Sequence, residues 1–144
     1  MNKFTVVTGI VLALGSLNSI ADARADLGEP AAKLTLQDGT ERRFYTTGPA
    51  GTRTYRVDVS SAGKVLGTAQ VLNEDSFQKI RAGMLATDVF ASIGPPHSKM
   101  RFKATKTTAW DYHFRDLWNY DADFSVIVDD AGVVVGKFTS HRTQ

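Results

Sequence analysis

One pattern occurs twice in this sequence and constrains the fold more than any other feature. Residues 55–67 (YRVDVSSAGKVLG) align without gaps on residues 124–136 (FSVIVDDAGVVVG). The valines, the Ala-Gly pair and the last glycine coincide, and each segment predicts a β-hairpin with glycine in the left-handed position of a bulged turn. Unrelated bulged hairpins can look alike, but the extent of the agreement favours an internal duplication.

The duplication extends upstream of the hairpins. Residues 27–30 (LGEP) resemble residues 93–96 (IGPP) at nearly the same distance from their hairpin. Each unit is therefore expected to contain helices, then Gly-x-Pro, then antiparallel strands. The first unit is interpreted as having lost its helices, with a signal peptide in their place.

Residues 74–96 predict two short helices joined by a tight turn. Asp75 or Ser76 can begin the first helix, because a short polar side chain accepts hydrogen bonds from first-turn N–H groups. Gly83 suits the left-handed residue that ends this helix. The second helix carries apolar residues at a spacing of four, namely Leu85, Val89 and Ile93. Gly94 and the two prolines after it end the second helix.

Alternating or apolar runs bounded by turn residues predict eight strands. They span residues 33–36, 41–46, 54–59, 64–72, 99–103, 108–114, 123–128 and 133–139. The expected fold class is α+β: a two-helix hairpin on an antiparallel sheet (an ααβββ unit), preceded by an additional N-terminal antiparallel β unit. The expected divisions are a signal peptide (1–25), a strand unit (26–73), a helix-helix-sheet domain (74–140) and a tail (141–144).

The N-terminus is typical of a secretory signal peptide. Lys3 provides the positive start, residues 5–17 form an apolar run, and residues 23–25 (ARA) offer an A-x-A cleavage site. The run is short for a membrane-spanning helix, which needs about 20 residues, although an uncleaved anchor is the alternative. We expect cleavage after Ala25 and export to the periplasm, with the mature protein at most peripheral to an outer membrane.

Charge and cysteine content exclude several classes of protein. The formal net charge is +2, and cleavage after Ala25 removes two basic residues and one acidic residue. A nearly neutral mature chain has no electrostatic footprint for nucleic acid. Cysteine is absent, which excludes disulfides, thiolate metal sites and a lipidated N-terminal cysteine.

No catalytic or metal-binding pattern is present. His97, His113 and His141 have no His-x-x-x-His spacing. The acidic residues between positions 116 and 130 lack the ligand spacing of a calcium loop, so they are interpreted as solvated turn residues. We expect no catalytic residues, no metal, no cofactor and no enzymatic activity.

Two surface features are candidates for binding. Lys99, Arg101 and Lys103 share one face of a predicted strand, where they either protect a sheet edge from pairing or bind anionic lipid headgroups. Leu117, Trp118 and Tyr120 lie in an otherwise polar loop, where they either fold back onto the core or anchor a partner protein.

The second unit resembles the SmpA/OmlA-type outer-membrane lipoprotein domain of BamE-like assembly factors. The matching motifs are Phe77-x-x-Ile80-x-x-Gly83-Met84, Asp88-Val89, Ile93-Gly94-x-Pro96, Trp110-x-Tyr112-x-Phe114 and the hairpin from Phe124 to Val134. The resemblance implies two helices on a three-stranded sheet, contact with the barrel-assembly machinery, and anionic lipid as a further partner. The family usually has Thr where this chain has Leu85, so either Thr87 caps the second helix instead or a cap worth about 1 kcal/mol is lost.

These expectations lead to two functional hypotheses. The first is a non-enzymatic periplasmic protein at the outer membrane that binds a protein partner in envelope assembly or integrity. The alternative is a soluble inhibitor-like module that blocks an enzyme through its sheet face, since the tandem arrangement is similar to β-lactamase-inhibitor proteins.

Overall fold

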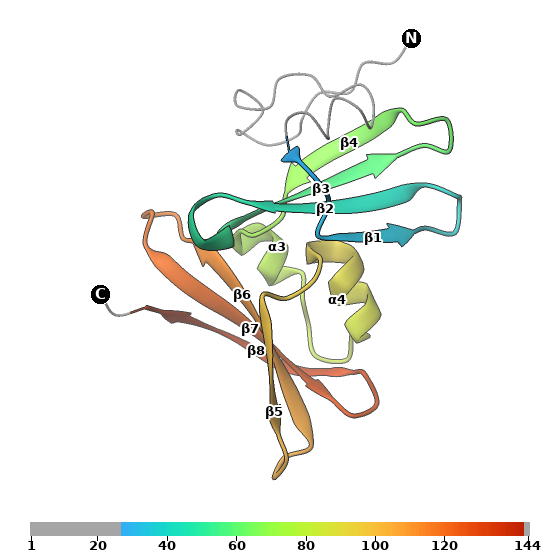
Figure 1. The fold of residues 1–144 in the computed structure, drawn as a ribbon. Coiled ribbons are helices and arrows are strands. Elements are labelled where there is room, and N and C mark those ends of the chain that lie inside the picture. The colour runs from blue at the N-terminus through green and yellow to red at the C-terminus, as the bar shows by residue number, and fades with distance from the viewer. Residues whose placement is uncertain (1–26, 143–144) are drawn as a thin grey trace.

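Two four-stranded antiparallel sheets form most of the protein in a computed structural model that describes residues 27–142 (Figure 1). Each sheet is a meander, in which strands that follow one another in sequence are neighbours. The first sheet consists of β1 (Ala32–Thr35), β2 (Glu41–Thr47), β3 (Arg53–Val59) and β4 (Val65–Gln70). The second sheet consists of β5 (Ser98–Phe102), β6 (Thr107–Arg115), β7 (Asp121–Asp129) and β8 (Val134–His141).

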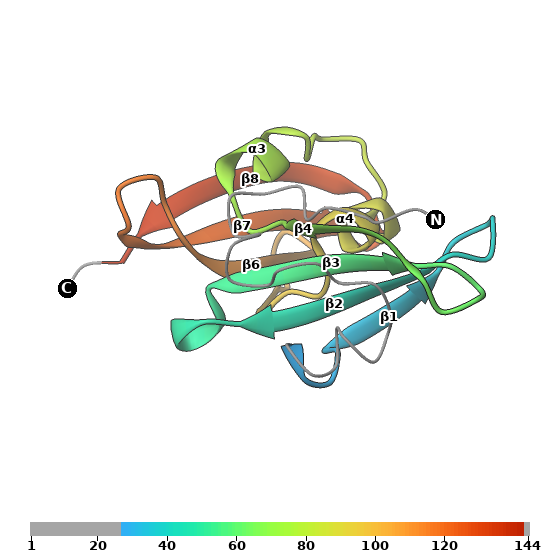
Figure 2. The ribbon, with the colours of Figure 1, turned by 90° about the horizontal axis from the view of Figure 1, so that it is seen from above.

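The expected α+β class is wrong, because the protein is mainly β. Its two helices, α3 (Glu74–Gln78) and α4 (Ala86–Ile93), have only 5 and 8 residues. Both helices lie between the sheets, with α3 beside β8 (Figures 1 and 2). All eight predicted strands are present within a few residues of the expected bounds. The class differs because the two helices are short beside the eight strands.

The two repeated segments form hairpins with the same irregularities. The strand register shifts between Asp58 and Val59 in the first sheet, and at the aligned pair Ile127 and Val128 in the second. Gly63 and its counterpart Gly132 both have left-handed φ, at 84° and 78°. The turn therefore requires glycine at both places, as the repeat predicts.

The helix starts differ from those expected from sequence. Asn73, rather than Asp75 or Ser76, caps α3, and its Oδ1 accepts a hydrogen bond from the Ser76 N–H at 2.9 Å. Leu85 stands at the N-cap of α4, and neither its side chain nor that of Thr87 makes a cap hydrogen bond.

A backbone contact replaces the missing side-chain cap of α4. The Ala86 N–H donates to the carbonyl oxygen of Gly132, in the turn between β7 and β8, at 2.7 Å. Leu85 also forms a β-bridge with Val133 and is 50% exposed, so its expected place in the apolar stripe is wrong. Val89 and Ile93 are buried as predicted.

The main core lies between the helices and the second sheet. Phe77 of α3 stacks on Phe124 with a 4.0 Å centroid separation and meets Phe114 edge-on at 4.8 Å. Tyr112 and Phe114 are fully buried, and Trp110 packs against the same cluster. The period-two spacing of these three aromatic residues accounts for their common inward orientation, because alternate residues of a strand share one face.

The first sheet holds the C-terminal end of α4 through polar contacts. Arg42 Nη1 donates to the Ala91 carbonyl oxygen at 2.8 Å, and Arg56 Nη1 donates to that of Ser92 at 2.9 Å. These carbonyls have no partner within the helix, and a positive charge near them also opposes the negative end of the helix dipole. Arg42 is itself fixed by a bidentate ion pair with Asp58.

Gly94 ends α4 at the point where both sheets meet. Its φ of 82° and ψ of −166° belong to a region that is essentially restricted to glycine. A Cβ atom at this position would lie 2.8 Å from Cδ1 of Phe44, in the first sheet. The carbonyl oxygen of Gly94 accepts a hydrogen bond from the buried Tyr112 hydroxyl, in the second sheet, at 2.8 Å.

His97 forms a second link between the two units. Its Nε2–H donates to the carbonyl oxygen of Gly51 in η1 (Pro49–Gly51) at 2.6 Å, and its Nδ1 accepts from the His113 N–H at 3.2 Å. Burial lowers the pKa of His97, against the opposing effect of the bond to Gly51. The link therefore requires the neutral imidazole.

The expected signal peptide and its cleavage site lie outside the described residues. Within residues 27–142, no helix is long and apolar enough to cross a membrane.

We predict that Gly94→Ala lowers the free energy of unfolding by about 1–3 kcal/mol, because of backbone strain, and that the contact with Phe44 adds to this loss. Chemical denaturation measures the change. Gly136→Ala is the matched control, since Gly136 has open space around it and no left-handed φ. Equal stability of the two variants would contradict this account of the α4 terminus.

We also predict that stability falls as the pH drops below about 6.5, the ordinary pKa of histidine. The folded-state pKa of His97 is lowered, so the unfolded chain takes up the proton first, and the stabilisation present above pH 6.5 is lost as the pH falls through the folded-state value. Denaturation curves between pH 7.5 and 5 measure this decline. His97→Gln keeps a donor and an acceptor but does not titrate, so an equally steep decline in that variant would contradict the assignment.

Candidate protein-binding surface

The loop between β6 and β7 is held in one shape by Asp116. Asp116 Oδ1 accepts hydrogen bonds from the backbone N–H groups of Trp118 and Tyr120, both at 2.9 Å. Its backbone N–H donates to the Tyr120 carbonyl oxygen at 3.0 Å. The hydrogen bonds from Tyr120 and Trp118 lower the pKa of Asp116 despite the opposing effect of desolvation, so the carboxylate remains charged and keeps the loop ordered at neutral pH.

The side chains of this loop point into solvent. Leu117 is 84% exposed, Trp118 79% and Tyr120 59%. The interpretation of these residues as a lid on the core is therefore wrong, whereas their role as anchors for a partner stays a prediction. An ordered loop loses little backbone entropy when its large apolar side chains bind a partner, which favours their use as anchors.

A groove runs from this loop along the free edge of β8. One hollow of about 320 Å³ lies beside the loop, and a second of about 270 Å³ continues past α3. Glu74 and Thr139 line both hollows, so the two hollows lie next to each other. Five aromatic residues supply apolar walls, namely Phe77, Phe114, Trp118, Phe124 and Phe138. Four charged or titratable residues border them, namely Glu74, Asp116, Lys137 and His141.

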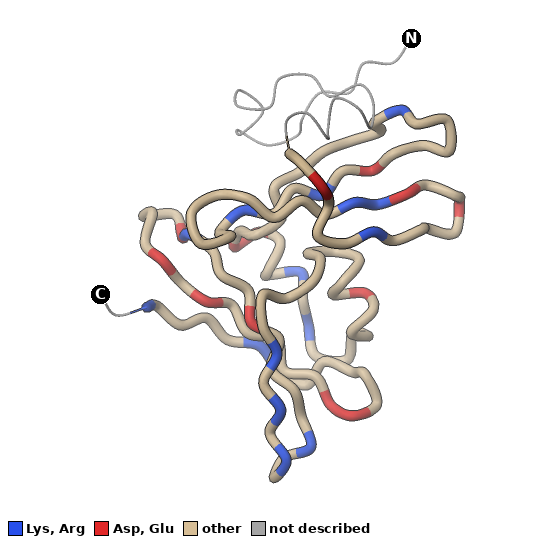
Figure 3. Tube along the Cα trace, in the orientation of Figure 1, with Lys and Arg blue, Asp and Glu red and all other residues tan. Residues whose placement is uncertain are grey.

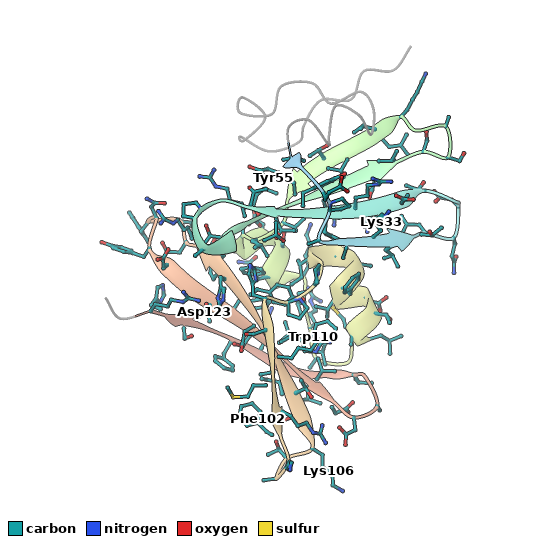
Figure 4. All side chains as sticks on the ribbon, in the orientation of Figure 1. Lys33, Tyr55, Phe102, Lys106, Trp110 and Asp123 are labelled. Atoms are coloured by element: carbon teal, nitrogen blue, oxygen red, sulfur yellow. The ribbon has the colours of Figure 1, made fainter. Side chains whose placement is uncertain are left out.

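The face of the second sheet that points away from the helices is also open. Strand register places Met100, Ala109 and Ile127 in one row across this face, and Phe138 beside Ser125 in the next. Met100, Phe102 and Phe138 are exposed. Figure 4 shows Phe102 on this open side of β5, whereas Trp110 is directed towards the helices.

A polar cluster borders the apolar part of this open face. Asp123 Oδ1 lies 2.5 Å from His113 Nδ1 and 2.9 Å from Arg142 Nη2. Burial opposes the charge of Asp123, but hydrogen bonds from Arg142 and His113 outweigh it and lower the pKa of this carboxyl. The open face therefore offers exposed apolar side chains next to a fixed carboxylate, a combination suited to another protein surface.

The predicted basic strip has partners within the chain. Figure 3 shows Lys and Arg positions along β5 and its turn. Lys99 Nζ lies 4.6 Å from the centroid of the Trp110 ring, and Arg101 forms an ion pair with Asp130. Two of the three predicted lipid-binding charges are thus engaged, and binding of anionic lipid through Lys99, Arg101 and Lys103 stays a prediction.

Among residues 27–142, no group of three or more His, Asp or Glu side chains could hold a metal ion. His97 and His113 are neighbours, with ring centroids 4.6 Å apart. His97 also binds the Gly51 carbonyl oxygen and His113 binds Asp123, whereas His141 Nε2 lies 3.0 Å from Asp116 Oδ2. Each of these histidine contacts joins two different segments of the fold.

Sequence reasoning found the loop but missed the groove and the open face. Alternation over residues 98–102 implies that Met100 and Phe102 point away from Lys99 and Arg101, and this signal was sufficient to place them. The groove gives no comparable signal, because Glu74 and Thr139 come from elements far apart in the sequence.

Comparisons with known proteins identify no family for this chain. No family model matches it, and no curated protein matches it. One similar solved structure is a candidate beta-lactamase inhibitor protein from Streptococcus mutans, at 11% identity, with 88% of this chain and 83% of that chain covered and a TM-score of 0.39. Another is a DUF4309 family protein from Bacillus subtilis, at 11% identity, with 86% and 78% covered and a TM-score of 0.34. Likenesses this weak carry no functional argument.

The expected membership of the SmpA/OmlA-type, BamE-like family is wrong. The similar solved structures are proteins of other kinds, and the second sheet has four strands where the resemblance implies three. Participation in outer-membrane protein assembly, which depended on that resemblance, is withdrawn with it. The alternative hypothesis, that the protein is a soluble inhibitor-like module, does not depend on the SmpA/OmlA resemblance.

We predict that Trp118→Ala changes the free energy of unfolding by no more than about 0.5 kcal/mol, because the side chain is exposed. Phe114→Ala, at a core residue that is 1% exposed, is the contrasting variant and should cost about 3–5 kcal/mol. Chemical denaturation of both variants checks this. A loss above 1 kcal/mol for Trp118→Ala would show that the loop is part of the core.

Proposed function

We propose that the protein is an exported, non-enzymatic binding module that engages another protein through the loop of residues 116–120, the β8 groove and the open face of the second sheet. The observation that carries this proposal is the ordered exposure of Leu117, Trp118 and Tyr120. Blocking an enzyme is one form of such binding. Export is supported by the signal-peptide pattern of residues 1–25.

The loop and the groove supply different parts of an interface. Trp118 and Leu117 stand at one end of the groove, so an apolar side chain of the partner can enter the groove while Trp118 packs over it. Glu74, Asp116 and Lys137 border the same groove and provide the polar rim that surrounds the apolar centre of most protein interfaces.

The order of the loop itself contributes to the proposed affinity. The Asp116 carboxylate fixes the loop through two hydrogen bonds, from the backbone N–H groups of Trp118 and Tyr120. Asp116→Ala keeps all three exposed apolar side chains but releases the loop. It should weaken partner binding through the added cost of ordering, which distinguishes preorganisation from simple contact area.

A site-specific crosslink in the producing cells tests the proposal. A photo-crosslinking residue at Leu117 is expected to give a discrete adduct with one partner protein. The matched control places it at Lys64, an exposed residue in the β3–β4 turn of the other unit. Adding Trp118→Ala should reduce the adduct at Leu117 about tenfold or more, as for a residue that carries much of the binding energy. No adduct at Leu117, or equal adducts at both positions, would contradict the proposal.

A further inference from the structure

The edge of the second sheet at β8 carries backbone groups that have no partner among residues 27–142. β8 is the last strand of this sheet and pairs with β7. The Arg142 N–H donates to the Asp121 carbonyl oxygen at 3.2 Å, and this bond sets the phase of the pairing, because inward and outward backbone groups alternate along a strand. Three residues of β8 therefore direct their N–H and C=O groups away from β7, namely Lys137, Thr139 and His141.

The chain itself pairs with the beginning of this edge. The Val134 N–H donates to the Met84 carbonyl oxygen at 2.8 Å, and the Val134 carbonyl oxygen accepts from the Gly83 N–H at 2.7 Å. The segment before α4 thus lies against the start of β8 as a short added strand would. Beyond Val134, the outward groups of β8 are left for a strand that the described part of the chain does not supply.

The two edges of the second sheet differ in their protection against pairing. Proteins protect edge strands with charged side chains, especially lysine. All five residues of β5 are exposed, and Lys99 and Arg101 are among them. β8 contains a single lysine, Lys137, and its Nζ donates to the carbonyl oxygen of Phe77 in α3 at 2.9 Å. Because this lysine is held against α3, β8 keeps little of the protection that β5 has.

The two hollows follow the edge of β8 at the spacing of a strand. Lys137, Phe138 and Thr139 line the first hollow, and Thr139 and His141 line the second. Phe138 points to the opposite face of β8 from Lys137 and Thr139, so the first hollow lies at the edge itself and not over one face. The hollows succeed each other about two residues, or about 6–7 Å, along the strand. Side chains on one face of an added strand have the same separation.

The walls of both hollows favour apolar side chains. Phe77 and Phe124 line the first hollow, and Phe114, Leu117 and Trp118 line the second. An added strand with apolar residues at positions i and i+2 could therefore place one side chain in each hollow.

A second copy of this chain is a poor occupant of the edge. In an antiparallel pair of β8 strands, the residues with outward backbone groups stand opposite one another. The side chains that enter the hollows would then be those of Lys137, Thr139 and His141, which are polar or charged. Burying such groups against aromatic walls without hydrogen-bond partners is unfavourable. The occupant must therefore have a different sequence from β8.

We propose that an extended segment of the partner protein adds to β8 as a further strand, with apolar side chains at alternate positions in the two hollows. Its backbone forms hydrogen bonds with Lys137, Thr139 and His141, and Trp118 packs on the side chain in the second hollow. Backbone bonds supply affinity in this mode of recognition, and the pockets for alternate side chains supply specificity. The inference rests on the proposed function and adds to it the form of the bound segment.

Amide hydrogen exchange of the isolated protein, measured residue by residue, tests whether the edge is available. The amides of Phe138 and Ser140 face β7 and should be protected. Those of Thr139 and His141 should exchange about tenfold faster or more, because an amide without a partner needs no opening of the sheet. Equal protection of all four amides would overturn the proposal, and protection that rises with protein concentration would identify a second copy as the cover.

Proline at the edge tests the added strand. Thr139→Pro removes an outward donor and leaves the β7 pairing intact, at a position where edge strands tolerate proline. It should reduce the crosslinked adduct at Leu117 about tenfold or more, because the added strand loses a hydrogen bond and meets the proline ring. Thr35→Pro is the matched control: Thr35 is an exposed residue of β1 whose N–H faces away from β2, and the adduct should be unchanged.

The outcomes separate this inference from the proposed function. An undiminished adduct in folded Thr139→Pro would overturn strand addition and leave the proposed function intact. No adduct in the unsubstituted chain would contradict the proposed function and this inference together. Hydrogen exchange of the purified adduct gives a reading that needs no substitution at the edge. The amides of Thr139 and His141 should become protected there, and free exchange of both would also overturn strand addition.

Discussion

The C-terminal end of α4 connects the two sheets, and most other features depend on this contact. The ring of Phe44 closes over Gly94 from the first sheet, while the Tyr112 hydroxyl holds the Gly94 carbonyl from the second. Arg42 and Arg56 donate hydrogen bonds to the carbonyl oxygens of Ala91 and Ser92 in the last turn of the helix. A helix of eight residues is marginal by itself, so its stability comes from these contacts and from the apolar core beneath it.

This arrangement leaves one region of the second unit available for binding. The helices cover one face of the second sheet, so its other face stays open. Within residues 27–142, β8 is an edge strand with a groove beside it. The loop of residues 116–120 lies at the end of that groove and is fixed by the carboxylate of Asp116. The proposed binding surface is therefore formed by three elements that the fold brings together.

The sequence predicted local features well, for identifiable reasons. Alternating or apolar runs between turn residues located all eight strands. The period-two spacing of Tyr112 and Phe114 explains why both are buried, because side-chain direction in a strand follows from position alone. The helix caps were less predictable. Leu85 lacks a capping side chain, and its helix is completed by the carbonyl of Gly132, a contact between residues distant in the sequence. The groove was equally hard to predict, because Glu74 and Thr139, which both line it, lie far apart in the sequence.

By itself, the sequence determined the repeat, the turns that need glycine and the apolar residues that must be buried. These are properties of short segments, which backbone sterics and side-chain alternation govern. Only the tertiary structure decided which face each sheet presents to α4, whether Trp118 is buried or exposed, and how much of the fold is helical. These depend on packing between segments far apart in the chain. For the first sheet, packing placed Arg42 and Arg56 against α4 and the valines of β3 on the opposite face.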